Sequence, residues 1–281
     1  MSSALKILYI AEIVGKPGIF TLKTLLPSLK KDYAPHLVVA CADGATGGFG
    51  LGKNHAFYLH KLGINILTGG EWIYNKKDLH EILDKSSHIL RPANFPAQAP
   101  GKGWKILDIE GQKVAVVCLM GQAGFSRTHA SSPFHGLDYI LQQIADKCRP
   151  HKPIVVVDFH AATTAEKQLL FYHARGRVAA VIGSHQKVLT ADAHILEEGT
   201  AVITDAGRTG SQLSVGGFNP ALEIQQICQG FPERSEESWE GLELQGVLIE
   251  ITTEGKALSI QTIKIPCKEV PHDHIRHDSE S

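Results

Sequence analysis

The sequence has few cysteines and no spacing that would make them act as a group. Five cysteines are scattered over 281 residues, without a CxxC pair. An odd number at irregular spacing argues against a disulfide framework and against a zinc knuckle. We therefore expect a protein of a reducing compartment, which predicts a cytoplasmic location.

The chain also lacks an excess of charge and any long apolar run. Lys and Arg total 28 and Asp and Glu total 29, so the formal net charge is −1 with neutral histidines. This balance, with no basic stripe interleaved with aromatic residues, gives no reason to expect nucleic acid or an acidic membrane as a partner. The apolar stretch at residues 7–10 is interrupted at Glu12, so we expect neither a signal peptide nor a membrane span.

Phosphate-binding loops are absent as well, although the chain contains 27 glycines. The glycine clusters match neither GxGxxG nor GxxxxGK[ST] in the required context, and tight turns explain them better. Two long loops, residues 121–133 and 207–220, are polar and rich in glycine or serine. Segments of this kind often border a functional site.

Apolar β-branched runs alternate with helical patterns along most of the chain. Strands are expected at residues 6–10, 37–41, 64–67, 114–119, 154–159, 178–182 and 201–204, and helices at 20–31, 53–62, 76–84, 137–147 and 165–173. This alternation predicts βαβ units and an α/β fold of two packed sheets. Residues 244–252 and 257–265 flank a turn and predict a hairpin.

No repeat or linker divides the chain. We expect a single domain over residues 1–265 and a disordered tail over residues 266–281.

Polar side chains stand at the ends of five predicted strands in succession. They are Glu12, Asp43, Glu71, His160 and His185. Ligands of open α/β sheets bind just beyond the carboxyl ends of the strands, so these side chains predict one shared polar site. The two histidines are placed to share a metal or a phosphate.

Several short segments resemble the YmdB-type family of metallophosphoesterases. They are ILYIAEIVGKPG at 7–18, RPANFP at 91–96, PGKG at 100–103, DFHA at 158–161, EKQ at 166–168, TAD at 190–192, GT at 199–200 and TD at 204–205. The resemblance runs from about Leu5 to Ile265. It implies a calcineurin-like metallophosphoesterase fold, with two packed β-sheets flanked by helices. Members of the family are dinuclear metal phosphodiesterases associated with 2′,3′-cyclic nucleotides and with iron or manganese.

The resemblance assigns the two metal positions unequal sets of ligands. One ion would be held by the residues at Asp43, Glu71, His160 and His185, all of which can coordinate a metal. Asp43 stands where the family has the glutamate that bridges both ions. Glu71 stands in place of an asparagine ligand, and both histidines match ligand histidines.

The second metal position has lost half of its ligands. By the same resemblance it would use Glu12, in place of an aspartate, together with Asp43, but Gly44 replaces an asparagine ligand. Lys187 replaces a histidine ligand, and a charged ammonium cannot coordinate a metal. Lys187 could instead place its positive charge where the second ion would lie.

Charge counting leaves two ways to compensate the carboxylates. Three negative charges, on Glu12, Asp43 and Glu71, and one positive charge, on Lys187, leave a net charge of −2. One divalent ion, iron or manganese, would neutralise it. Alternatively, Lys187 and Arg208 together could offset most of the acids with no metal at all.

The resemblance also places Trp72 where the family has the histidine thought to protonate the leaving group. An indole cannot supply a proton at neutral pH, and loss of a general acid costs roughly 10²–10⁴ in rate. Trp72 is expected to plug the pocket, or else to stack on a base.

Two functional hypotheses follow. The favoured one is a divergent member of the family with a degraded dinuclear site, a pseudo-enzyme whose hydrolysis is weak or lost and which acts by binding a nucleotide or a protein partner. The alternative is an active metal-dependent phosphodiesterase on 2′,3′-cyclic nucleotides with a rearranged site, in which Glu12 and Asp43 exchange side-chain lengths. In either case we expect a homo-oligomer.

Overall fold

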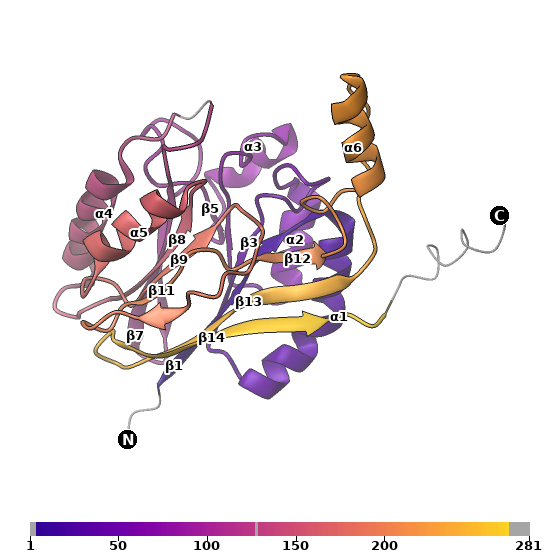
Figure 1. Cartoon of the computed structure of the whole chain (residues 1–281). Helices are drawn as coiled ribbons and strands as arrows, with labels where there is room; N and C mark the ends of the chain where they lie inside the picture. The colour runs from indigo at the N-terminus through magenta and orange to yellow at the C-terminus, as the bar shows by residue number, and fades with distance from the viewer. Residues whose placement is uncertain (1–3, 127–128, 270–281) are drawn as a thin grey trace.

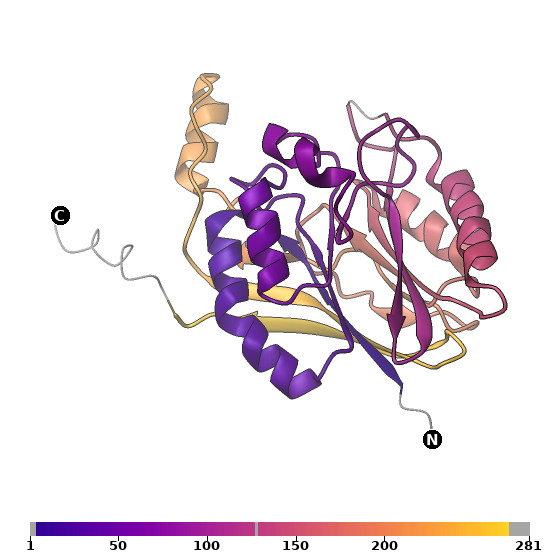
Figure 2. The ribbon, with the colours of Figure 1, turned by 180° about the vertical axis from the view of Figure 1, so that it is seen from behind.

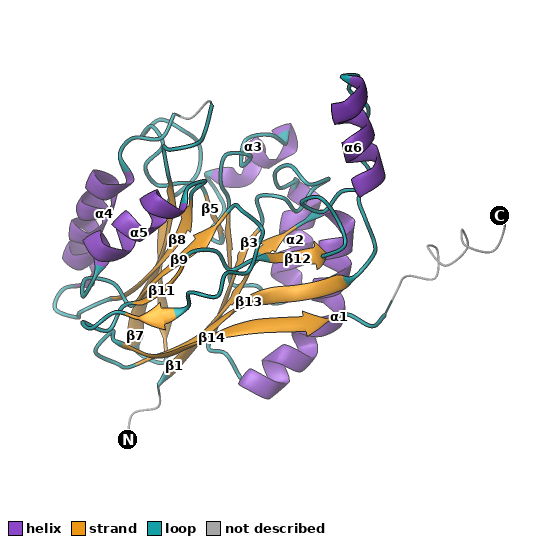
Figure 3. Ribbon diagram, in the orientation of Figure 1, coloured by secondary structure: helices purple, strands orange, loops and turns teal. Residues whose placement is uncertain are grey.

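Two β-sheets packed face to face, with helices on their outer faces, form the body of the molecule (Figure 1). The computed structural model describes residues 4–126 and 129–269. Figure 3 shows the strands in the middle layers and the helices outside them, apart from one helix that projects from the body. The predicted α/β fold of two packed sheets is confirmed.

The first sheet contains eight strands. They are β1 (Leu5–Ile10), β2 (Glu12–Ile13), β3 (Leu37–Cys41), β4 (Ile66–Thr68), β5 (Ile89–Leu90), β12 (Arg208–Ser211), β13 (Leu242–Ile251) and β14 (Ala257–Pro266). The order is β2-β12-β13-β1-β3-β4-β5, with β14 paired to β13. Strands β1, β3, β4 and β5 run parallel to one another, whereas β13 is antiparallel to its neighbours β1, β12 and β14.

The second sheet contains six strands in the order β10-β11-β9-β8-β7-β6. They are β6 (Trp104–Ile109), β7 (Gln112–Met120), β8 (Ile154–His160), β9 (Ala180–Ser184), β10 (His194–Ile195) and β11 (Ala201–Ile203). Strands β7, β8, β9 and β11 are parallel to one another. Their carboxyl ends therefore share one edge, as do those of β1, β3 and β4.

Six helices lie among the described residues. They are α1 (Gly15–Tyr33), α2 (Lys53–Lys61), α3 (Lys77–Leu83), α4 (Pro133–Cys148), α5 (Thr164–Ala174) and α6 (Pro220–Gln229). The view from behind shows α1 and α2 against the first sheet and α4 and α5 on the far side of the second (Figure 2). None of these helices is long and apolar enough to cross a membrane.

Side-chain alternation along the strands explains the three apolar layers. In β1, Ile7 and Tyr9 point into the core between the sheets, whereas Leu8 and Ile10 pack toward α1 and α2. The second sheet repeats this division, because Val116 of β7 faces the inter-sheet core and Val117 faces α4 and α5. The central strands, such as β3, β8 and β9, are thus buried on both faces, which explains their nearly continuous apolar sequences.

The predicted hairpin is confirmed as β13 and β14, which pair antiparallel along their length. Six elements were not predicted: the short strands β2, β5 and β10, together with β6, β12 and α6. The predicted domain boundary at residue 265 falls at the end of β14, and the predicted tail lies mostly outside the described residues.

Candidate metal centre

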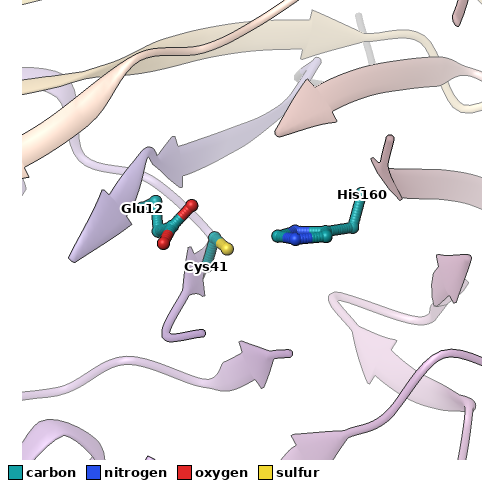
Figure 4. A group of neighbouring side chains, drawn as sticks. All are labelled: Glu12, Cys41 and His160. Atoms are coloured by element: carbon teal, nitrogen blue, oxygen red, sulfur yellow. The ribbon is translucent and has the colours of Figure 1, made fainter. Parts of the chain in front are cut away.

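Strands from both sheets bring the predicted polar residues together. Glu12 begins β2, Asp43 follows β3, and Glu71 follows β4 in the first sheet, whereas His160 ends β8 and His185 follows β9 in the second. Glu12 and His160 approach each other across the space between the sheets, on either side of Cys41 (Figure 4). The predicted shared site therefore lies where the carboxyl ends of the strands of the two sheets meet.

Four side chains form a compact set of metal donors. The Glu71 carboxylate is hydrogen-bonded to His160 Nε2 and lies 3.1 Å from His185 Nδ1. His185 Nδ1 is also 3.1 Å from His160 Nε2, and an oxygen of Asp43 lies 3.7 Å from the same nitrogen. Ligand atoms of Glu71, His160 and His185 all fall within 4.8 Å of one another. Two carboxylates and two imidazoles suit a divalent transition metal such as iron or manganese, so the donor set fits one ion.

Burial and charge make this part of the site attractive to cations. Asp43 is fully buried, and burial raises the pKa of its carboxyl to about 7. Burial alone would lower the pKa of His160, but the neighbouring Glu71 and Asp43 raise it to about 10. Burial likewise opposes ionisation of Glu71, yet His160 outweighs it and lowers the Glu71 pKa. The carboxylates thus hold positive charge beside them, as expected of a cation site.

Cys41 belongs to a second group of neighbouring donors at the base of the site. One ligand atom each of Glu12, Cys41 and His160 lie within 4.8 Å of one another (Figure 4). Burial, followed by the charges of Asp158 and Glu12, raises the pKa of the Cys41 thiol well above its usual value. A protonated thiol is a poor ligand, so Cys41 serves here as a small buried side chain.

Lys187 makes an ion pair at the position where the resemblance places the second metal. Its Nζ lies 3.3 Å from Glu12 Oε1, and the side chains are 18% and 2% exposed. The charge of Glu12 raises the pKa of Lys187, so the lysine carries its charge at neutral pH. Among the described residues, the other oxygen of Glu12 has no hydrogen-bond partner. The predicted fixed cation is therefore in contact with the site.

Gly44 and Glu12 fit each other sterically. A Cβ added at Gly44 would lie 2.8 Å from Glu12 Oε1 and 3.1 Å from the Ile13 carbonyl oxygen. The longer acid at position 12 therefore fills space that a side chain at position 44 would need.

The loop that carries His185 and Lys187 has an unusual backbone. His185 has φ of 99° and Lys187 has φ of 62°, both in the region that favours glycine. Non-glycine residues rarely adopt these values, and such residues cluster at functional sites. The buried Asp205 carboxylate stabilises this loop, because it accepts a hydrogen bond from the Gln186 N–H at 2.9 Å and pairs with Lys167 at 2.9 Å.

Three polar residues orient His160, and the sequence analysis missed their role. Ser184 Oγ lies 3.2 Å from His160 Nδ1 and donates to Asp158 Oδ1 at 2.7 Å, while Thr68 donates to the other Asp158 oxygen. This series of hydrogen bonds leaves His160 Nε2 directed at Glu71 and Asp43. A carboxylate within the apolar strand β8 was the signal that could have identified Asp158.

The sequence predicted Arg208 as a second cation beside the acids, and the charges of Glu243 and Glu12 partly offset the lowering of its pKa by burial. Its guanidinium donates to the carbonyl oxygens of Ser211, Lys187 and Gln212, at 2.7, 2.8 and 3.1 Å. Among the described residues it forms no ion pair with a carboxylate of the site. Two of these carbonyls are local, because Ser211 and Gln212 follow Arg208 by three and four residues. Arg208 therefore positions the backbone of Lys187.

The Trp72 side chain packs against another aromatic ring, and its plugging of the pocket stays a prediction. It is 38% exposed and makes an edge-on contact with Phe49 at a centroid distance of 5.3 Å. Its backbone N–H donates to Asp43 Oδ2 at 3.1 Å, which places the residue at the rim.

Both long loops border the centre. Phe125 of the first loop packs 4.9 Å from the His185 ring, and Phe218 of the second stacks on Phe49. On another side, a groove of about 870 Å³ begins at Lys187 and Arg208 and extends over β14 to Lys264.

Comparisons with known proteins match nearly the whole chain. A family model described as YmdB-like protein matches residues 8–263. A 2′,3′-cyclic-nucleotide 2′-phosphodiesterase of Bacillus subtilis is 34% identical over 262 residues, which cover 93% of this chain and 97% of that protein.

Solved structures show the same architecture. A novel phosphatase of Mycoplasma pneumoniae superposes with a TM-score of 0.87 at 29% identity, over 95% of both chains. A hypothetical protein from Thermus thermophilus gives 0.85 at 27% identity, over 93% of this chain and 99% of its own. A 5′-nucleotidase precursor of the same organism, 12% identical, has a TM-score of 0.55 over 94% of this chain and 54% of its own, and shares the fold alone.

Proposed function

This chain belongs to the YmdB-like family, and we propose that it is a metal-dependent phosphodiesterase of 2′,3′-cyclic nucleotides with a rearranged site. The observation that carries the proposal is the set of Asp43, Glu71, His160 and His185 beside the Lys187–Glu12 ion pair. A relative that shares 34% of its residues is named for this reaction. The five cysteines are all free, which agrees with the cytoplasmic location that forms part of the proposal.

The donor set supports one metal ion per chain. Such an ion supplies Lewis-acid stabilisation of a phosphoryl oxygen and lowers the pKa of a bound water. Asp43, Glu71, His160 and His185 would hold it, and Ser184 would keep His160 in the required orientation. A dinuclear site holds two ions about 3.5–4 Å apart. Here the ammonium of Lys187 provides the second positive charge beside Glu12.

Lys187 can stabilise charge on a phosphate ester but cannot replace all the functions of a metal ion. Its ammonium can donate hydrogen bonds to phosphoryl oxygens, and its pKa is raised by Glu12. It cannot activate a water. Trp72 offers no proton for the leaving group. We therefore expect turnover slower by roughly 10²–10⁴ than that of a relative with a general acid.

A second candidate function is nucleotide binding with hydrolysis lost. Two features favour it: Lys187, which pairs with Glu12, stands at a position that the resemblance assigns to a ligand of a second metal, and Trp72 stands at the position that it assigns to the general acid. The same metal donors and the same ligand are involved, so the two candidates differ only in turnover.

One experiment decides between them. Purified protein is incubated with Mn²⁺ or Fe²⁺ and 2′,3′-cyclic AMP, and the release of AMP is compared with that of a His185→Ala variant. Circular dichroism checks that both proteins are folded. Metal-dependent turnover that His185→Ala abolishes is the expected result.

Calorimetric titration with the same nucleotide completes the test. Binding without turnover above the His185→Ala level would favour the second candidate. Neither binding nor turnover with either metal would contradict both.

A further inference from the structure

We propose that Trp72, Phe49 and Phe218 form a stacking shelf for the base of the nucleotide. The inference rests on the proposed function, because it assumes that the ligand of the neighbouring site is a nucleotide. It assigns Trp72 to binding of the base, at the position where the resemblance places a proton donor.

The three rings make one continuous aromatic cluster at the rim of the metal centre. Phe49 and Trp72 meet edge to face, with centroids 5.3 Å apart and planes at 76°. Phe49 and Phe218 are stacked, with centroids 5.4 Å apart and planes at 18°. Trp72 and Phe49 are each 38% exposed and supply the aromatic surface that faces solvent, whereas Phe218 is buried and supports Phe49.

Backbone hydrogen bonds connect the shelf directly to a metal donor. The Trp72 N–H donates to Asp43 Oδ2 at 3.1 Å, and the Gly50 N–H donates to the Asp43 carbonyl at 2.5 Å. Asn75 Nδ2 donates to the Phe49 carbonyl at 3.2 Å. The segments that carry Phe49 and Trp72 are therefore fixed relative to Asp43.

Close packing also fixes the far end of the shelf. A Cβ at Gly48 would lie 2.2 Å from the Phe218 ring, so the ring rests against bare backbone at this glycine. Gly48 has φ of 79°, a value that glycine adopts without strain. Rings held in this way lose little conformational freedom when a ligand stacks on them, which favours binding.

A nucleobase is the ligand that best suits this surface. Every base has a π-face, and stacking on aromatic side chains tolerates all four bases. The phosphate ester would meet the metal donors and Lys187, while the base would lie against Trp72. An exposed aromatic cluster with no ligand to cover it would cost solubility and gain nothing.

The test compares two substrates that differ only in the base. The holoprotein, loaded with Mn²⁺, is titrated with 2′,3′-cyclic AMP and with methyl riboside 2′,3′-cyclic phosphate, which has no base. Trp72→Ala is expected to weaken binding of cyclic AMP by about 5- to 100-fold, the range of stacking on one aromatic residue. Binding of the base-free compound should stay within about twofold.

Matched variants separate stacking from a merely structural effect. Trp72→Phe keeps an aromatic ring and should retain most of the affinity for cyclic AMP. Trp104→Phe, on β6, alters another tryptophan and should change the affinity for neither compound. Gln261→Ala tests the groove over β14 as the competing place for the base.

Three results have distinct meanings. If Trp72→Ala leaves cyclic AMP binding unchanged while both compounds bind to the protein, the shelf is wrong and the proposed function stands. If Gln261→Ala weakens the binding of cyclic AMP but not of the base-free compound, and Trp72→Ala weakens neither, the base lies in the groove. The shelf is then again overturned. If neither compound binds to the folded, metal-loaded protein, the proposed function itself fails.

Discussion

Three residues of the site fit one another in size and charge: Glu12, Gly44 and Lys187. Position 12 has glutamate, the longer of the two acidic residue types, and Lys187 Nζ lies 3.3 Å from its Oε1. Gly44 leaves the space that the longer acid occupies. Each of these residues therefore depends on another, so a substitution at one of them alone should lower the stability of the protein.

Gly44→Asn tests this dependence. The new Cβ would lie 2.8 Å from Glu12 Oε1, so the variant should lose about 1–3 kcal/mol of stability, as expected for overpacking. Combining it with Glu12→Asp, which shortens the acid, should recover a large part of the loss. Urea denaturation of both variants measures the free energy of unfolding. An unchanged stability of the single variant would contradict the steric account.

Ser184→Ala tests the orientation of His160. Without the hydroxyl between His160 Nδ1 and Asp158, the imidazole is free to turn, and metal affinity should fall about 10–100-fold. The measurement is a competition titration with a metal-binding dye. Ser28→Ala on the exposed surface of α1 is the control and should bind metal like the parent protein. Equal affinity of the two variants would remove Ser184 from the account.

At the scale of elements, a buried ion pair connects α5 to the loop after β11. Lys167 and Asp205 are both fully buried, 2.9 Å apart, and the other Asp205 oxygen accepts from Gly207 at 3.0 Å. The Asp205 carboxylate also accepts from Gln186, next to His185. The strained His185–Lys187 segment is thus supported from the interior of the domain.

Lys167→Met leaves the Asp205 carboxylate buried without its partner and should destabilise the protein by about 3–5 kcal/mol. In the double variant Lys167→Met with Asp205→Asn, the neutral amide keeps an oxygen for Gln186 or Gly207, so much of that stability should return. Chemical denaturation gives the comparison. If the double variant were less stable than the single one, the buried charge would not be the cause.

The elements also show what sequence could and could not predict. Alternating strands and helices predicted the two-sheet fold, and the rule that ligands bind at strand ends brought Glu12, Asp43, Glu71, His160 and His185 together. The role of Arg208 could not be predicted, because its partners are loop carbonyls whose positions depend on the fold of residues 211–214. The aromatic contacts of Trp72 could not be predicted for a similar reason, since Phe49 and Phe218 join it only through long-range packing.

At the scale of the whole molecule, α6 stands apart from the body (Figures 1 and 2). All of this helix is described, and no residue of it is buried. Ile224 and Ile227, three residues apart, are 60% and 85% exposed. A helix of ten residues is marginal by itself, and we propose that a partner covers this apolar face. A second copy offering the same face would satisfy the predicted homo-oligomer.

Ile227→Glu should therefore shift the protein from an oligomer to a monomer in sedimentation velocity. Leu258→Glu, a substitution of another exposed apolar residue, on β14, serves as the control and should leave the assembly intact. A parent protein that sediments as a monomer would contradict the homo-oligomer, and an Ile227→Glu variant that stays oligomeric would exclude α6 as the interface.

The central proposal is that one metal ion and Lys187 together occupy a site which, by the resemblance, would hold two ions. Its most direct test is the metal content per chain, determined by elemental analysis of protein purified without chelator from cells supplied with iron and manganese, beside a Lys187→His variant. The account predicts about one ion per chain in the parent, held by Asp43, Glu71, His160 and His185, and a rise in the variant. Two ions in the parent, or none, would contradict it.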